Sequence, residues 1–322
     1  MPSLRDIRIR ITSIKSTGKI TRAMQMVSAS KLRKAQSNIL MARPYSNSLR
    51  SLIVTLAAGI DDKENYPLLS VRPIRRVEVM VLTSDKGLCA AFNTNVLKDT
   101  QRLLADLRRQ GAEVSLTTIG KKAKDYFHRF GVPVRKSVVG FYKTLTYDQV
   151  QGIANEIITS YTGVRPDDRP DNRSDDSPND RIDELIIVYN EFKSTLVQTV
   201  KRMRLLPIEQ SPIEPLPKEH STPKADNSTD SPKEQIKFLF EPSEVEIING
   251  LLPKYVENRL YQTILESQVS EEAARMVAME NATQNVKEML EKLTLQYNKA
   301  RQASITNELL DIVGGAAAIT SS

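Results

Sequence analysis

The residues best suited to chemistry lie in one loop, Ser84–Cys89, which follows the first predicted strand. Asp85, Lys86 and Cys89 place a carboxylate, an amine and a thiol close together, a set that can act as acid, base or nucleophile in an active site. A turn from a strand into a helix commonly contains the same residue types, because Asp and Gly favour turns. The turn is the better interpretation, so we expect no catalysis in this loop.

Motifs for binding nucleotides or metals are missing from the sequence. No Gly-x-Gly-x-x-Gly run occurs, and Gly120-Lys121 lacks the glycine that a phosphate loop needs five positions earlier, where Ser115 stands. Of the two histidines, His220 lies in a segment of low complexity, so we expect neither a histidine pair nor a metal cage with His128. The sequence therefore predicts a chain without a cofactor, a metal or an active site of its own.

Length and composition limit the class of protein further. The 322 residues leave room for about two domains. The single cysteine, Cys89, excludes an intramolecular disulfide and a cysteine-based metal cluster. The N-terminus lacks the apolar run of a signal peptide, and no segment approaches the roughly 18 apolar residues of a membrane span. We expect a soluble protein on the cytosolic side, with no direct membrane insertion.

The elements that would position any site are dominated by two long helices, predicted at residues 1–60 and 241–319. Apolar residues recur in both at spacings of three and four, which is the helical period. They are Leu4, Ile7, Ile11, Ile14, Ile20, Met24, Val27, Leu32, Ala35 and Ile39 in the first helix and Val256, Leu260, Ile264, Ala273, Val277, Val286, Leu290, Leu293, Tyr297 and Ala300 in the second. A helix of roughly 55 residues is about 80 Å long. We therefore predict that the two helices project together as an antiparallel coiled coil.

Small and polar residues interrupt both apolar stripes. Gly18, Thr21 and Ser28 occupy seam positions of the first helix, and Ser304 and Asn307 those of the second. Such residues allow the two backbones to approach closely, or leave room for contact with a third body. The stripes can represent packing within a helical bundle, but their length favours an isolated arm or a partner that encloses the pair.

Positive charge is concentrated on the first helix. Residues 1–50 contain eleven Lys or Arg and one acid, Asp6, in a chain whose net charge is +7. Such a rod can bind nucleic acid, lie on anionic lipid or face acidic protein loops, or it can simply be a solvated face. The lipid interpretation is weakened by a small apolar face without Trp or Phe. The nucleic-acid interpretation lacks a recognisable motif, so the residues alone leave these alternatives open.

Between the helices the period alternates between that of a strand and that of a helix. Buried strands are predicted at 76–83, 113–119 and 183–189, the last followed by an antiparallel partner at 195–205. Helices are predicted at 95–110, 121–130 and 146–161. Strands separated by helices indicate an α/β fold with a mainly parallel, Rossmann-like sheet, here at residues 74–206.

Two segments are predicted to be disordered insertions, at 165–182 and 207–237. The first is built from Asp, Arg, Pro, Asn and Ser, the second contains six prolines, and both contain almost no large apolar residues. They cannot bury enough surface to offset the entropy of ordering. A regulatory role is one interpretation of these insertions, and a tolerated insertion is the favoured one.

Two terminal runs closely resemble the gamma subunit of rotary ATP synthases. The first runs from Ile14 to Arg33 (IKSTGKITRAMQMVSASKLR) and the second from Tyr297 to Ala316 (YNKARQASITNELLDIVGGA). Ser84–Asn93 and Ala274–Thr283 are similar to internal landmarks of the same family. The resemblance covers nearly the whole chain except the two insertions.

The resemblance implies a central rotor shaft without catalytic activity of its own. In that family the helix pair enters a ring of alpha and beta subunits, and the α/β domain forms a foot near the membrane. Proton flow turns a ring of c subunits and the foot with it, so that the asymmetric shaft drives the catalytic beta subunits through different nucleotide affinities. The implied partners are the alpha, beta and epsilon subunits and the c ring. The implied location is peripheral, on the cytoplasmic side of a bacterial inner membrane.

The same resemblance assigns contacts to particular residues. Those expected to face the alpha and beta ring are Lys19, Arg22, Met24, Arg275, Arg301, Gln302, Thr306 and Glu308. Phe240 and Glu241 are expected in the foot, near the membrane ring and the epsilon subunit. The apolar segment 312–319 is expected to turn within a hydrophobic sleeve.

The insertion at 207–237 departs from the family in its lack of cysteine. Chloroplast relatives carry paired cysteines near the insertion at 207–237, and this insertion has none, which excludes that thiol switch.

The alternative function is a free basic coiled-coil protein that binds nucleic acid, and it predicts salt-sensitive binding to DNA or RNA.

Overall fold

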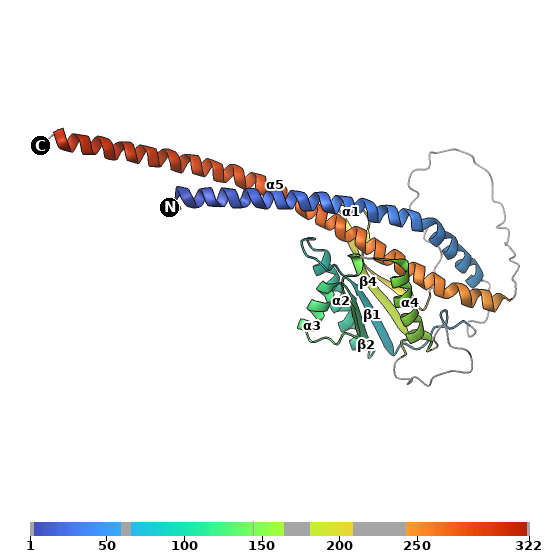
Figure 1. The fold of residues 1–322 in the computed structure, drawn as a ribbon. Coiled ribbons are helices and arrows are strands. Elements are labelled where there is room, and N and C mark those ends of the chain that lie inside the picture. The colour runs from blue at the N-terminus through green and yellow to red at the C-terminus, as the bar shows by residue number, and fades with distance from the viewer. Residues whose placement is uncertain (1–2, 59–65, 144, 164–180, 209–242, 321–322) are drawn as a thin grey trace, which may run out of the picture.

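The two terminal helices pair side by side in antiparallel direction and project far beyond the rest of the chain (Figure 1). In this computed structural model the described residues are 3–58, 66–143, 145–163, 181–208 and 243–320. Helix α1 spans Leu4–Ala58, 55 residues, and helix α5 spans Glu244–Thr320, 77 residues. The predicted coiled coil is confirmed.

Contacts along the pair define a single register. Gly18 lies against Val286, Thr283 donates a hydrogen bond to Thr21 over 2.9 Å, and Ser46 donates one to Asn258 over 2.5 Å. Residue numbers therefore rise along α1 while those of the contacting residues fall along α5. Gly18 permits this approach, because a Cβ atom there would lie 2.7 Å from Val286 Cγ1 and would force the Val286 side chain to shift. The small and polar seam residues thus permit close approach of the two helices.

The seam differs from the predicted apolar stripe at two positions. Ile20 and Val27 are 61% and 55% exposed, while the next residues, Thr21 and Ser28, are buried. Each residue advances a helix by about 100°, so Ile20 and Val27 point away from α5. Their inclusion in the packed stripe was wrong, because the close approach at Gly18 fixes the rotation of α1.

The α/β domain is a five-stranded sheet in the order β3-β2-β1-β4-β5. Strands β1 to β4 are parallel, and β5 runs antiparallel to β4. Its elements are β1 (Arg76–Leu82), α2 (Phe92–Arg109), β2 (Glu113–Ile119), α3 (Lys121–Arg129), β3 (Lys136–Val138), η1 (Phe141–Lys143), α4 (Tyr147–Thr162), β4 (Glu184–Phe192) and β5 (Gln198–Leu206). This arrangement confirms the predicted α/β fold with a mainly parallel sheet.

Alternating side chains of the central strands serve two different layers. On β1, Val77, Val79 and Val81 pack toward α2 and α3, whereas Met80 and Leu82 pack into the core formed with α4 and α5. Successive strand residues point to opposite faces, so both faces of the sheet are covered. The beginning of α5 therefore belongs to the domain core as well as to the projecting pair.

Some predicted features are refined and others fall outside the described residues. Strand β3 and the short helix η1 were not predicted, because three residues are too few to show a period. The insertion at 165–182 is described only at its last two residues, of which Ile182 is buried, and that at 207–237 only at Pro207 and Ile208. Among the helices of the described residues, none combines the length and apolarity needed to cross a membrane.

Candidate functional site

The most informative site is the junction where α5 meets the carboxyl edge of the sheet. In doubly wound sheets this edge binds ligands where neighbouring strands connect in opposite directions, here between β1 and β4. In this chain α5 closes that position. Ala274 packs against Cys89 and Phe92, and the Ser270 hydroxyl donates to the Asn190 carbonyl over 2.9 Å. The crevice that could have held a nucleotide instead holds the long helix.

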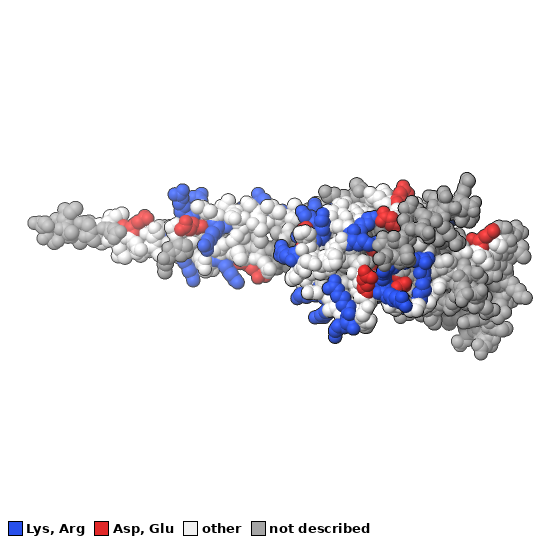
Figure 2. All heavy atoms as spheres, turned by 90° about the horizontal axis from the view of Figure 1, so that it is seen from below, with Lys and Arg blue, Asp and Glu red and all other residues white. Residues whose placement is uncertain are grey.

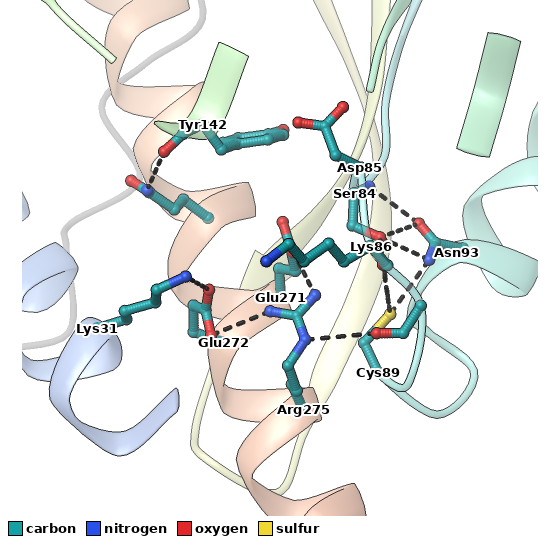
Figure 3. A network of polar contacts seen from close by, with 12 residues as sticks. Lys31, Ser84, Asp85, Lys86, Cys89, Asn93, Tyr142, Glu271, Glu272 and Arg275 are labelled. Atoms are coloured by element: carbon teal, nitrogen blue, oxygen red, sulfur yellow. Dashed lines mark hydrogen bonds and ion pairs between the residues drawn. The ribbon is translucent and has the colours of Figure 1, made fainter. Parts of the chain in front are cut away.

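The loop singled out for chemistry, Ser84–Cys89, is tied together by its own side chains (Figure 3). The Ser84 amide donates to Asn93 Oδ1 over 3.0 Å, and Asn93 Nδ2 donates to Cys89 Sγ over 3.1 Å. Asp85 Oδ1 accepts hydrogen bonds from the amides of Lys121 and Gly140, at 3.0 and 3.1 Å. Asp85 thus joins the loop to the turns after β2 and β3.

Burial of the loop changes the chemistry of its thiol. Cys89 is 2% exposed, and burial raises the pKa of its thiol, against smaller lowering by the Ser84 hydrogen bond and Arg275. The thiolate, which is the reactive form, is therefore disfavoured. Together with the backbone contacts of Asp85, this arrangement suits positioning of the loop better than nucleophilic attack.

Two residues of the loop have unusual backbone conformations. Leu88 and Ala90 have φ of 62° and 48°, in the left-handed region that costs a residue with a side chain roughly 1–2 kcal/mol. The hydrogen bonds around Cys89, which lies between them, offset that cost. The result is a rigid loop that presents Leu88, 62% exposed, at the surface.

Arg275 is the centre of an ionic network that connects this loop to both long helices (Figure 3). Its guanidinium contacts Glu271 at 2.5 Å and Glu272 at 3.0 Å, both on α5, and its Nε donates to the Gly87 carbonyl over 3.4 Å. Lys31 on α1 completes the chain through Glu272, at 3.6 Å. Three elements far apart in sequence are therefore held to one another.

The network lines a cleft of about 340 Å³ in which charge of both signs is gathered. Burial raises the pKa of Glu271 to about 7, although Arg275 lowers it, while Glu272 and Asp85 raise it further. Burial likewise raises the pKa of Tyr142, which lines the same cleft. Buried charges are costly, so the junction depends on the pairing of Arg275 with Glu271 and Glu272.

The predicted contact residues divide into four groups in the structure. Lys19 and Arg22 are exposed on α1, with Met24 half-buried, and Figure 2 shows cationic side chains along the shaft. Arg275 differs from the expectation of a ring contact, since it is 6% exposed and its guanidinium is used within the chain. Phe240 and Glu241 lie outside the described residues.

The remaining predicted contacts lie near the end of the shaft. Arg301, Gln302, Thr306 and Glu308 are all exposed. Gly18 lies against Val286, so Leu4, the first residue of α1, lies level with about residue 300 of α5. These four side chains are therefore carried by a part of α5 that α1 no longer accompanies (Figure 1).

Sequence reasoning missed several members of the junction. Glu271 and Glu272 precede Arg275 by four and three positions, a spacing that allows ion pairs on one helix face and could have drawn attention to them. Asn93 was noted only as the end of a family landmark. Asn190 and Ser270 carry no sequence signal, because their pairing depends on how α5 crosses the sheet.

Fold and junction together define a class of protein, a helical shaft rooted in an α/β foot. A family model described as ATP synthase matches residues 3–319. The ATP synthase gamma chain of Pelotomaculum thermopropionicum is 41% identical over 321 residues, covering 99% of this chain and 100% of that one. The chain belongs to the family of ATP synthase gamma chains.

Further comparisons agree with this assignment. The ATP synthase gamma chain of Heliobacterium modesticaldum is 39% identical over 319 residues, and the match covers 99% of this chain and 100% of that one. In the mitochondrial ATP synthase of Euglena gracilis, one chain matches with a TM-score of 0.64 and 20% identity, covering 98% of this chain and 94% of that chain. The structural likeness concerns the fold. None of these matches favours the nucleic-acid alternative.

Proposed function

We propose that this chain is the rotating central shaft of a proton-driven ATP synthase. It is a non-catalytic component that couples rotation of a membrane ring to conformational change in catalytic beta subunits. The observation that carries the proposal is the continuity of α5. One helix of 77 residues begins in the foot, is clamped at 270–275 in the sheet crevice, and ends in an exposed segment beyond α1. Such a helix can transmit torque from one end to the other.

Proposed partners follow from the two ends of this shaft. The Tetrahymena structure that this chain resembles is a central stalk with c-ring, and the Euglena assembly contains OSCP, F1 and c-ring. By analogy, the tip of α5 and the basic face with Lys19, Arg22 and Met24 contact alpha and beta subunits. The foot, including Phe240 and Glu241, contacts the c ring and the epsilon subunit. The assembly lies on the cytoplasmic side of a bacterial inner membrane.

The tip contacts can be tested by replacing Arg301 and Gln302 together with alanine. Loss of charged hydrogen bonds costs about 1.5–3 kcal/mol each, so we expect ATP synthesis in inverted membrane vesicles to fall at least tenfold while the complex still assembles. The exposed Lys292, on the same helix, provides a matched control through Lys292→Ala. Unchanged synthesis in the double variant would remove these residues from the proposed contact.

The proposal as a whole is tested by native mass spectrometry of the complex isolated from its own cells. We expect the chain to be found with alpha and beta subunits. A chain that is isolated alone, and that binds DNA or RNA with an affinity that falls steeply as salt rises, would instead support the nucleic-acid alternative.

A further inference from the structure

A polar pocket of about 100 Å³ lies between α1 and α5, on the foot side of the junction. Above it the seam is closed by the apolar cluster of Leu32, Ala35 and Val269, and below it by Leu49 and Ile53 in the domain core. The pocket therefore lies between two apolar stretches of the seam. Its polar lining forgoes hydrophobic stabilisation at this level of the shaft.

Hydrogen-bond donors from both helices converge on this pocket. On α1 they recur at spacings of three and four, which places them on one face, and the same holds on α5. The polar lining residues are Arg43, Ser46, Asn47 and Arg50 from α1 and Tyr255, Asn258, Arg259, Gln262 and Glu266 from α5.

Positive charge exceeds negative charge in the lining. Three guanidinium groups, those of Arg43, Arg50 and Arg259, face one carboxyl group, that of Glu266. Burial raises the pKa of Glu266, and Arg259 is the largest charge that acts against this rise, with smaller lowering by Tyr189 and Lys201. In the described part of the chain, neither Arg50 nor Arg259 makes an ion pair within 4 Å.

The size and chemistry of the pocket select one class of ligand. Its volume is well below the roughly 300 Å³ of pockets that hold small organic molecules, but well above the roughly 10–15 Å³ that a single water molecule needs. Planar guanidinium groups bind tetrahedral oxyanions through paired hydrogen bonds. We propose that this pocket binds a free tetrahedral oxyanion of the inorganic phosphate type, held between Arg50 of α1 and Arg259 of α5.

Binding there would have a structural consequence. The oxyanion would bridge the two helices just above the foot, and a ligand that binds only the folded chain stabilises it by mass action. Phosphate would therefore strengthen the attachment of α1 to α5 at the base of the shaft. This inference concerns the chain by itself and does not depend on the proposed function.

The test is titration of the full-length chain with inorganic phosphate by isothermal calorimetry, at constant ionic strength maintained with chloride. We expect saturable binding with one site, and at least tenfold weaker binding by Arg50→Gln and by Arg259→Gln, because each removes a charged donor. The exposed Arg33 of α1 supplies the control: Arg33→Gln should bind as the unmodified chain does.

A second measurement covers variants that fold poorly. Arg50→Lys and Arg259→Lys keep the charge but lose the planar fork, so phosphate should still raise their unfolding temperature, by less than in the unmodified chain. Sulfate, of the same shape, should stabilise the unmodified chain as well, and chloride should not. The proposal is wrong if phosphate shows no saturable binding, or if Arg50→Gln and Arg259→Gln both bind it undiminished.

Discussion

Individual residues at the junction are held in states that they would avoid in water. Glu271 combines burial with two nearby carboxylates, Glu272 and Asp85, and only Arg275 opposes their effect. Arg275 is buried, and it joins α5 to the loop through the Gly87 carbonyl. The residue that resembles a ring contact by sequence is thus a structural clamp, because a long cation on a buried helix face must find its partners nearby.

The raised pKa of Glu271 predicts a particular dependence of stability on pH. Its pKa rises from 4.5 to about 7 on folding, so the folded chain holds the proton more tightly than the unfolded chain. The contribution of Glu271 to the free energy of unfolding is then full below about pH 4.5 and is lost as the pH rises through about 7, a change on the order of 3 kcal/mol.

We expect Glu271→Gln to remove this part of the pH dependence. Chemical denaturation of the full chain between pH 5 and pH 8 measures it, with Glu280→Gln at an exposed position of the same helix as the control. An equal fall in stability with rising pH in Glu271→Gln and in the unmodified chain would contradict the assignment.

At the scale of elements, the helix pair depends on one close approach. Gly18 admits Val286 where any larger side chain would collide with it, and this contact turns Thr21 and Ser28 into the seam in place of Ile20 and Val27. The Gly18 backbone packs directly against the Val286 side chain, and such close packing leaves little room for α1 to turn about its axis.

Substitution of Gly18 by valine should therefore separate the helices locally. Overpacking typically costs about 1–3 kcal/mol, and Val286→Ala in the same chain should restore much of that loss. Denaturant unfolding of the two single variants and the double variant gives the coupling between these positions. The exposed Ser16→Val is the control, and additive effects of Gly18→Val and Val286→Ala would show that the contact is unimportant.

For the whole molecule, the important feature is a shaft that is left uncovered at its tip. Beyond α1, large apolar side chains of α5 are 49–67% exposed, namely Ile305, Leu309, Leu310, Ile312 and Val313. Exposed apolar surface of this kind marks an interaction site. It agrees with the expectation that segment 312–319 turns in a hydrophobic sleeve, which stays a prediction.

Removal of residues 304–322 should consequently have different effects on folding and on association. The described residues of this segment are remote from the α/β domain (Figure 1), so we expect the unfolding temperature of the truncated chain to change by no more than a few degrees. Self-association of the isolated chain, measured by light scattering, should decrease. A large drop in unfolding temperature would mean that the tip stabilises the foot.

The sequence by itself determined the elements of this protein and their class. Helical and strand periods are local properties, so the two long helices, the parallel strands and the final antiparallel pair could all be predicted, as could the exposure of Lys19 and Arg22. The short strand β3 could not, because three residues carry no period. The family assignment also needed only the two terminal runs of residues.

The tertiary structure alone decided how these elements act together. The choice of Thr21 over Ile20 for the seam, the capture of α5 in the sheet crevice and the polar pocket at Arg50 and Arg259 all depend on contacts between residues at least 80 positions apart. A period shows which face of a helix is apolar, but it does not show what that face will meet. For that physical reason Asp85, Cys89 and Arg275, which attracted functional interpretations in the sequence, prove to be the residues that join the shaft to its foot.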